Sequence, residues 1–338
     1  MKYDLATLQG NFNSALNEMY DDYELAYIDK AKDQYVLTIK NGIVYNRGLL
    51  FQSEVFPNEQ PYDPVYDIHV MNRARDLPLV YKRTHKLARV KGTTLFVYHK
   101  FQWNIYHTFL HDCNTYLNCT VSTNNDIQYD NVFRFANNKI NEFVYNKFLP
   151  GKNIISDESF WFDKLVIVNS GIVTYTDNLA VLENQVRMLR DEFLLKPQPG
   201  TAKLFIYRTK GGRKIQNIEQ LKQYFTSKNF TVLSDNDLCK LSLNEQAVLY
   251  SSAKEIFSIF DSSLYNLTFC SPGTRVVVAE PTYKHMEGNE DAFEKVCKIV
   301  NAKYIPIPVT HPRQTSRNWR DLSYNIDTAV LDEYFKEA

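Results

Sequence analysis

The second half of the chain alternates between short continuous apolar runs and segments whose apolar residues recur every three or four positions. Uninterrupted runs are typical of strands buried on both faces, and the recurring spacing is typical of one-faced helices. Strands that alternate with helices predict parallel βαβ units, and therefore an α/β fold. The expected strands are residues 203–207, 230–233, 255–260, 275–279 and 303–307, and the helices begin near Asn217, Ser242, Ser262 and Asp291.

Helix signals stand on both sides of the clearest break in the pattern. Apolar residues spaced by three and four predict a helix that begins at Asp177 or Asn178 and runs to Phe193. The segment Lys196-Pro-Gln-Pro-Gly200 then interrupts both helix and strand, so we place a domain boundary there. Further on, Ser242-Leu-Asn-Glu245 is a capping-box sequence, which predicts reciprocal hydrogen bonds in the first turn of a helix.

The first half has weaker patterns. Residues 164–168 form a short β-branched run that predicts a buried strand, and Asn41-Gly42 between alternating apolar positions predicts a hairpin over residues 35–44. We therefore expect two α/β halves with a cleft between them. The expected domains are residues 1–196 and 197–310, followed by a helical tail, residues 311–338, that packs back on the N-terminal domain.

Composition narrows the functional classes. The chain has 338 residues, and 39 Lys+Arg balance 39 Asp+Glu, so no net positive charge favours a nucleic-acid partner. No apolar stretch approaches about 18 residues, and the start lacks signal character, so we expect no membrane span, no export signal and a cytoplasmic location. Five cysteines without C-x-x-C spacing favour a reducing compartment over disulfides or structural zinc.

Polar residues follow several of the expected strands, at the edge where parallel sheets bind ligands. A basic turn with two glycines carries Arg208 and Arg213, which suit bidentate binding of a diphosphate; a solvated basic turn is the alternative. Ser262 and Ser263 open a helix and either offer hydroxyl and N–H groups to an anion or serve as a simple cap. Glu280 either accepts hydrogen bonds from ribose hydroxyls or faces solvent.

His107, His111 and Asp112 are the candidate catalytic residues of the first half. Two histidines four positions apart share one helix face, as a metal pair does, but no third ligand follows at a recognisable spacing. His107 or Asp112 is the better candidate for a general base that activates a hydroxyl; a hydrogen-bonded structural histidine is the alternative. The triplet Asp235-Asn-Asp237 is a D-x-D sequence that holds a metal in some transferases, although such loops are common. We therefore expect no metal.

Four segments match one known family in residue type and spacing. They are Asn104-Ile-Tyr-His107; Tyr207-Arg208 with Arg213 and Asn217; Leu243-Asn-Glu-Gln246; and Ser262-Ser-Leu-Tyr-Asn266 followed by Phe269-Cys-Ser-Pro-Gly-Thr274. Together they resemble glycosyltransferase family 61 over most of the chain. The last block usually opens with His-Gly-Ala in the family, whereas this chain has Phe260-Asp261-Ser262.

The resemblance implies a GT-B-like fold, in which two Rossmann-like domains with parallel sheets face a cleft. It implies that residues 1–196 present a glycan acceptor and residues 197–310 bind a nucleotide-sugar. The implied reaction is an inverting, metal-independent transfer of the sugar to an acceptor hydroxyl in surface polysaccharide or glycan synthesis, with no cofactor apart from the donor substrate. The expected partners are the nucleotide-sugar and the glycan acceptor, without nucleic acid; a lipid-linked acceptor would bring peripheral membrane association.

The resemblance also implies roles for single residues. His107, Asp112 and His111 become the catalytic candidates. The donor-binding candidates are Arg208, Arg213, Asn217, Glu245, Ser262, Ser263, Asn266 and Glu280. Two rival classes stay open: a non-catalytic glycan- or nucleotide-binding protein on the same scaffold, which Phe260 and Asp261 favour, and a different transferase, for example of phosphoryl groups.

Overall fold

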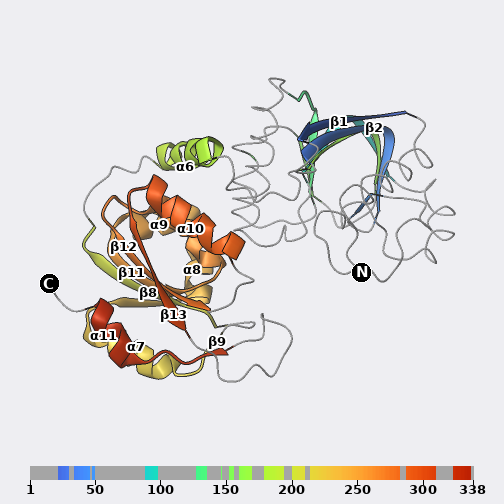
Figure 1. Cartoon of the computed structure of the whole chain (residues 1–338). Coiled ribbons are helices and arrows are strands. Elements are labelled where there is room, and N and C mark those ends of the chain that lie inside the picture. The colour runs from blue at the N-terminus through green and yellow to red at the C-terminus, as the bar shows by residue number, and fades with distance from the viewer. Residues whose placement is uncertain are drawn as a thin grey trace. The chain divides into compact units, whose positions relative to one another are not determined.

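A computed structural model of the chain divides into two compact units, Met1–Asp177 and Asn178–Ala338. Figure 1 shows the helices and strands of both units. No helix within the described residues is long and apolar enough to cross a membrane. The structure describes residues 22–29, 34–45, 48–49, 88–97, 127–134, 146, 152–155, 160–169, 179–193, 200–209, 214–281, 287–309 and 323–335.

The first unit contains a mixed seven-stranded sheet. Its strand order is β1-β2-β7-β4-β5-β6, with β3 paired to β2. Pairing is antiparallel from β1 through β2 to β7 and parallel from β7 through β4 and β5 to β6. The expectation of a parallel sheet in both halves is therefore corrected for this half. The strands are β1 Tyr23–Asp29, β2 Gln34–Tyr45, β3 Gly48–Leu49, β4 Ala88–Val97, β5 Asn131–Arg134, β6 Lys152–Ile155 and β7 Phe160–Asn169.

The Asn41-Gly42 pair does not form the predicted hairpin turn. Both residues lie inside β2, which pairs with β7 on either side of them. Asn41 has a φ of 55°, a left-handed conformation that asparagine tolerates. A Cβ on Gly42 would lie 2.8 Å from the Leu165 Cβ, so close packing explains this glycine. The hairpin prediction was wrong because both residues lie in the interior of strand β2, where the chain does not turn.

The second unit is built on a five-stranded parallel sheet with the order β10-β8-β11-β12-β13. This confirms the strands expected from the continuous apolar runs. Figure 1 places α7 and α11 on one face and α9 and α10 on the other. The strands are β8 Ala202–Tyr207, β10 Thr231–Ser234, β11 Ala253–Ile259, β12 Arg275–Pro281 and β13 Lys303–Val309, with a small parallel pair of β9 Lys214–Ile215 and β14 Ser323–Tyr324. The helices are α6 Leu179–Glu192, α7 Ile218–Ser227, α8 Asp235–Lys240, α9 Leu243–Ser251, the 3-10 helix η5 Ser262–Phe269, α10 Glu287–Ile299 and α11 Thr328–Tyr334.

An aromatic cluster fills the face of this sheet that α7 and α11 cover. The Phe225 ring lies 4.5 Å from Phe205, 4.7 Å from Phe257 and 5.5 Å from Phe335, measured between centroids. Leu331 and Phe335 are buried in the same cluster. The described part of the C-terminal segment, residues 323–335, thus contributes to the core of the second unit.

Helix α6 also belongs to the second unit. Leu182, Val186 and Leu189 are buried, as their spacing predicts. The Arg190 Nη1 donates to the carbonyl oxygens of Thr268, at 3.1 Å, and Cys270, at 2.6 Å, at the end of η5. The division between the units therefore falls before this helix, earlier in the chain than the break expected after residue 196.

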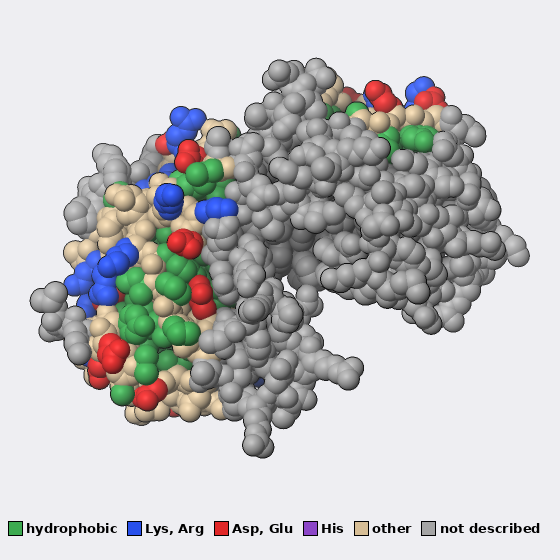
Figure 2. All heavy atoms as spheres, viewed as in Figure 1, with side chains coloured by type: hydrophobic (Ala, Val, Ile, Leu, Met, Phe, Trp, Pro, Cys, Tyr) green, Lys and Arg blue, Asp and Glu red, His purple; other side chains and the backbone are tan. Residues whose placement is uncertain are grey.

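The described surface of the second unit mixes both signs of charge. Figure 2 shows Lys and Arg side chains beside Asp and Glu side chains on the face in view. This mixture agrees with the balanced net charge of the sequence.

Candidate active site

The carboxyl edge of the second unit's sheet gathers polar residues from separate strands. Arg208 and Thr209 follow β8, Asp235 follows β10, and Asp261 follows β11. Since all five strands run parallel, these ends meet at one edge, where α/β proteins bind their ligands.

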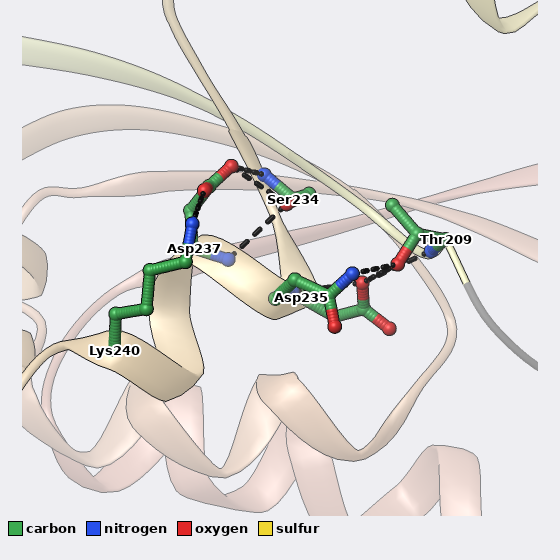
Figure 3. Close-up of polar contacts among 6 residues, drawn as sticks. Thr209, Ser234, Asp235, Asp237 and Lys240 are labelled. Carbon is green, nitrogen blue, oxygen red and sulfur yellow. Dashed lines mark hydrogen bonds and ion pairs between the residues drawn. The ribbon is translucent and has the colours of Figure 1, made fainter.

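Asp235 ties the ends of β8 and β10 together (Figure 3). Its Oδ1 accepts hydrogen bonds from the Thr209 backbone N–H at 3.0 Å and from the Thr209 hydroxyl. The Asn236 Nδ2 donates to the same hydroxyl oxygen at 2.8 Å. Asp235 therefore fixes the backbone immediately after Arg208.

Asp237, the second acid of the D-x-D triplet, caps a helix. Its Oδ2 accepts from the Ser234 N–H at 3.1 Å and the Ser234 hydroxyl at 2.6 Å, while Oδ1 pairs with Lys240 Nζ at 3.0 Å. Hydrogen bonds from Ser234, with a smaller contribution from Lys240, lower the pKa of Asp237 to about 2. Figure 3 shows that Asp235 and Asp237 contact different partners. Within the described residues, no group of three or more His, Cys, Asp and Glu side chains is placed to hold a metal.

Asp261 and Arg208 form a charge pair between the ends of β11 and β8. The Asp261 residue is 8% exposed, and its Oδ2 lies 4.0 Å from the Arg208 Nη1. Its Oδ1 accepts the Ser263 backbone N–H at 2.6 Å and so caps η5. Ser262 and Ser263 are both half-buried in the first turn of this helix. Among the described atoms, the buried Ser263 Oγ has no hydrogen-bond partner.

Gln246 joins η5 to helices α8 and α9. The buried Gln246 Oε1 accepts from the Tyr265 hydroxyl at 2.7 Å and from Asn266 Nδ2 at 3.0 Å. Its Nε2 donates to the carbonyl oxygens of Leu238 and Leu241. Asn266, a donor-binding candidate, is thus a buried residue of η5 inside the packed unit. Sequence reasoning gave Gln246 no role, although it stands in one of the quoted segments.

Glu245 and Asn217 both lie at helix starts. Glu245 Oε2 accepts from the Ser242 N–H and hydroxyl, both at 2.7 Å, which confirms the predicted capping box and lowers the pKa of Glu245. The Asn217 Nδ2 donates to the Ile326 carbonyl at 2.8 Å, and its Oδ1 accepts the Ile326 N–H at 3.2 Å. Asn217 therefore anchors the C-terminal segment.

Glu280 lies within β12, one residue before its end, and not beyond the strand as expected. The Tyr304 hydroxyl of β13 donates a hydrogen bond to its Oε1. Burial raises the pKa of Glu280, against the opposing effect of that hydrogen bond, and nearby Glu294 adds to the rise. The remaining candidates, His107, His111, Asp112 and Arg213, lie outside the described residues.

The structure thus brings together Arg208, Ser262 and Ser263 around Asp261, whereas Glu245, Asn217 and Asn266 bond within the fold.

A family model described as Glycosyltransferase 61 matches residues 68–277, more than half of the chain, and ends before Glu280. No curated protein matches the chain. The matched range includes all four segments quoted for the resemblance. The chain therefore belongs to glycosyltransferase family 61 and is a glycosyltransferase.

Proposed function

We propose that the protein transfers a sugar from a nucleotide-sugar to a hydroxyl of a glycan, with the donor diphosphate at the carboxyl edge of the second unit's sheet. The observation that carries this proposal is the meeting of Arg208 with the first turn of η5 at that edge. An arginine and the N–H groups of a helix start are suited to a diphosphate. Arg213, five positions later in the sequence and outside the described residues, is proposed to bind the same group.

The proposed mechanism is a single displacement with inversion, in a GT-B arrangement in which the first unit presents the acceptor. His107, or Asp112 in its place, takes the proton of the acceptor hydroxyl as its oxygen bonds to the anomeric carbon. The bond from that carbon to the diphosphate oxygen breaks, and its electron pair stays with the departing diphosphate. The cations and N–H groups stabilise the charge that develops there.

The proposed setting is polysaccharide or glycan synthesis in the cytoplasm, including acceptors carried on lipid. The thiols of Cys270 and Cys297 are buried, and burial raises the pKa of the Cys297 thiol to about 12, as is typical of structural cysteines. Thermal-shift measurements with UDP-, GDP- and CMP-sugars test the donor class. A ligand at 100 times its Kd stabilises a fold by about 2.7 kcal/mol, and the absence of any shift across the set would refute the donor site.

We expect the Arg208→Ala, Arg213→Ala double variant to bind the donor identified in that screen at least about tenfold more weakly, because charge-assisted hydrogen bonds to the diphosphate are lost. Calorimetry measures the change in Kd. Lys240→Ala is the matched control, since it removes an exposed cation that pairs with Asp237. Unchanged donor affinity in the double variant would contradict the assignment.

We expect turnover to survive EDTA. Asp235 and Asp237 already accept hydrogen bonds from Thr209 and Ser234, and the proposed site neutralises the diphosphate with arginine. Initial rates before and after chelation measure the effect. Activity lost on chelation and restored by Mn²⁺ or Mg²⁺ would overturn this prediction and favour a metal at the D-x-D triplet.

A further inference from the structure

Asp261 places a carboxylate where the proposed donor site needs positive charge. The side chain is 9% exposed, and its two oxygens face the two groups assigned to the diphosphate. Oδ1 accepts the Ser263 N–H at 2.6 Å, and Oδ2 lies 4.0 Å from Arg208 Nη1. An incoming anion therefore meets an N–H that is already bonded and a cation that is already paired.

The backbone holds both members of this charge pair in place. The Thr209 N–H bonds to Asp235 directly after Arg208, as Figure 3 shows. On the other side, the Phe260 N–H donates to the Ala279 carbonyl at 3.0 Å, and the Leu264 N–H donates to the Asp261 carbonyl at 3.2 Å. These backbone bonds fix the main chain at both Arg208 and Asp261, so the two side chains extend from held positions.

The Asp261 carboxylate repels the nucleoside diphosphate product more strongly than it repels the nucleotide-sugar donor. When the sugar leaves, the bonding electron pair stays on the terminal phosphate oxygen, so the released nucleoside diphosphate carries one more ionisable oxygen. The second pKa of a phosphate is about 6, so this oxygen is mostly ionised at neutral pH. A fixed carboxylate at the same site disfavours the more highly charged ligand more strongly.

We propose that Asp261 weakens the binding of the nucleoside diphosphate product relative to the nucleotide-sugar, and so promotes product release. This inference rests on the proposed donor site. Asp261 thereby acts as a specificity-determining residue that competes for Arg208 and for the first turn of η5.

The test is calorimetry with UDP, GDP and ADP, and with the corresponding nucleotide-sugars, on the full chain and its Asp261→Asn variant. Asparagine is as good an N-cap as aspartate and can still accept the Ser263 N–H, so the cap is kept while the negative charge is removed. We expect the nucleoside diphosphate to bind about tenfold more tightly, and the nucleotide-sugar to gain less. Asp261→Ser, another good N-cap, should show the same direction, and thermal unfolding verifies that both variants are folded.

The matched control is Asp237→Asn, which removes the same charge from another helix start in this unit without touching Arg208. It should change the Kd of the diphosphate by less than about twofold. If diphosphates bind the wild type but bind the folded Asp261 variants no more tightly, the inference is wrong and the donor site stands. If no diphosphate or nucleotide-sugar binds any form, the donor site is refuted, and the inference falls with it.

Discussion

Phe225→Ala should lower the free energy of unfolding of the second unit by about 3–5 kcal/mol, the usual cost of removing a fully buried aromatic ring. Phe225 is 0% exposed, and its ring contacts aromatic residues from two strands, the loop before β10 and the segment after α11. Neighbours anchored on a sheet collapse only partly into the vacated space, so the cavity adds to the lost burial.

Urea unfolding of the full chain measures this change. Val248→Ala is the control, because Val248 is 54% exposed on α9 and should shift stability by less than about 0.5 kcal/mol. A loss below about 1 kcal/mol in Phe225→Ala would mean that the aromatic cluster relaxes around the cavity, contrary to the packing described above.

His107→Ala should lower kcat by about 10²- to 10⁴-fold while leaving the donor Kd nearly unchanged. A general base acts on the acceptor proton in the transition state, and an ordinary histidine pKa of about 6.5 suits that task near neutrality. His107 lies in the range that the family model matches and in a segment that resembles the family's.

Steady-state kinetics and donor calorimetry together distinguish the loss of a general base from misfolding. The loss of a base lowers kcat alone, whereas a misfolded variant would lose both kcat and donor binding. His111→Ala should have the milder effect. A near-normal kcat in His107→Ala would remove this residue from the mechanism and leave Asp112, tested by Asp112→Asn, as the base.

The parallel half of the fold could be predicted from sequence because its signals are local. Strands β8 and β12 each contain a continuous apolar run, and β11 is apolar over most of its second half. The capping box of Ser242 and Glu245 spans four consecutive residues. Ser234 and Asp237 form a second capping box, although Asp237 is also the second acid of the D-x-D triplet. Both carboxylate oxygens of Asp237 already bond to Ser234 or Lys240, and a metal could bind them only if these bonds were broken.

The features that sequence reasoning missed depend on contacts between distant residues. The antiparallel pairing of β2 with β7 joins residues whose patterns give no information about each other. The buried bonds of Gln246 to Tyr265 and Asn266 depend on how α9 packs on η5. Leu331 and Phe335 have helical spacing, but nothing in that spacing identifies Phe225 as the partner. Such pairings follow from the assembled sheet.

The anchoring of the C-terminal segment has a consequence for synthesis of the protein. Asn217 bonds to the backbone of Ile326, 109 residues later, and Phe335 completes the cluster around Phe225. At about 5–20 residues per second, a ribosome takes roughly 5 to 20 seconds to synthesise the residues between them. During this interval the nascent second unit has an open aromatic face, so its folding finishes only after translation has passed α11, and this apolar surface is prone to aggregation until then.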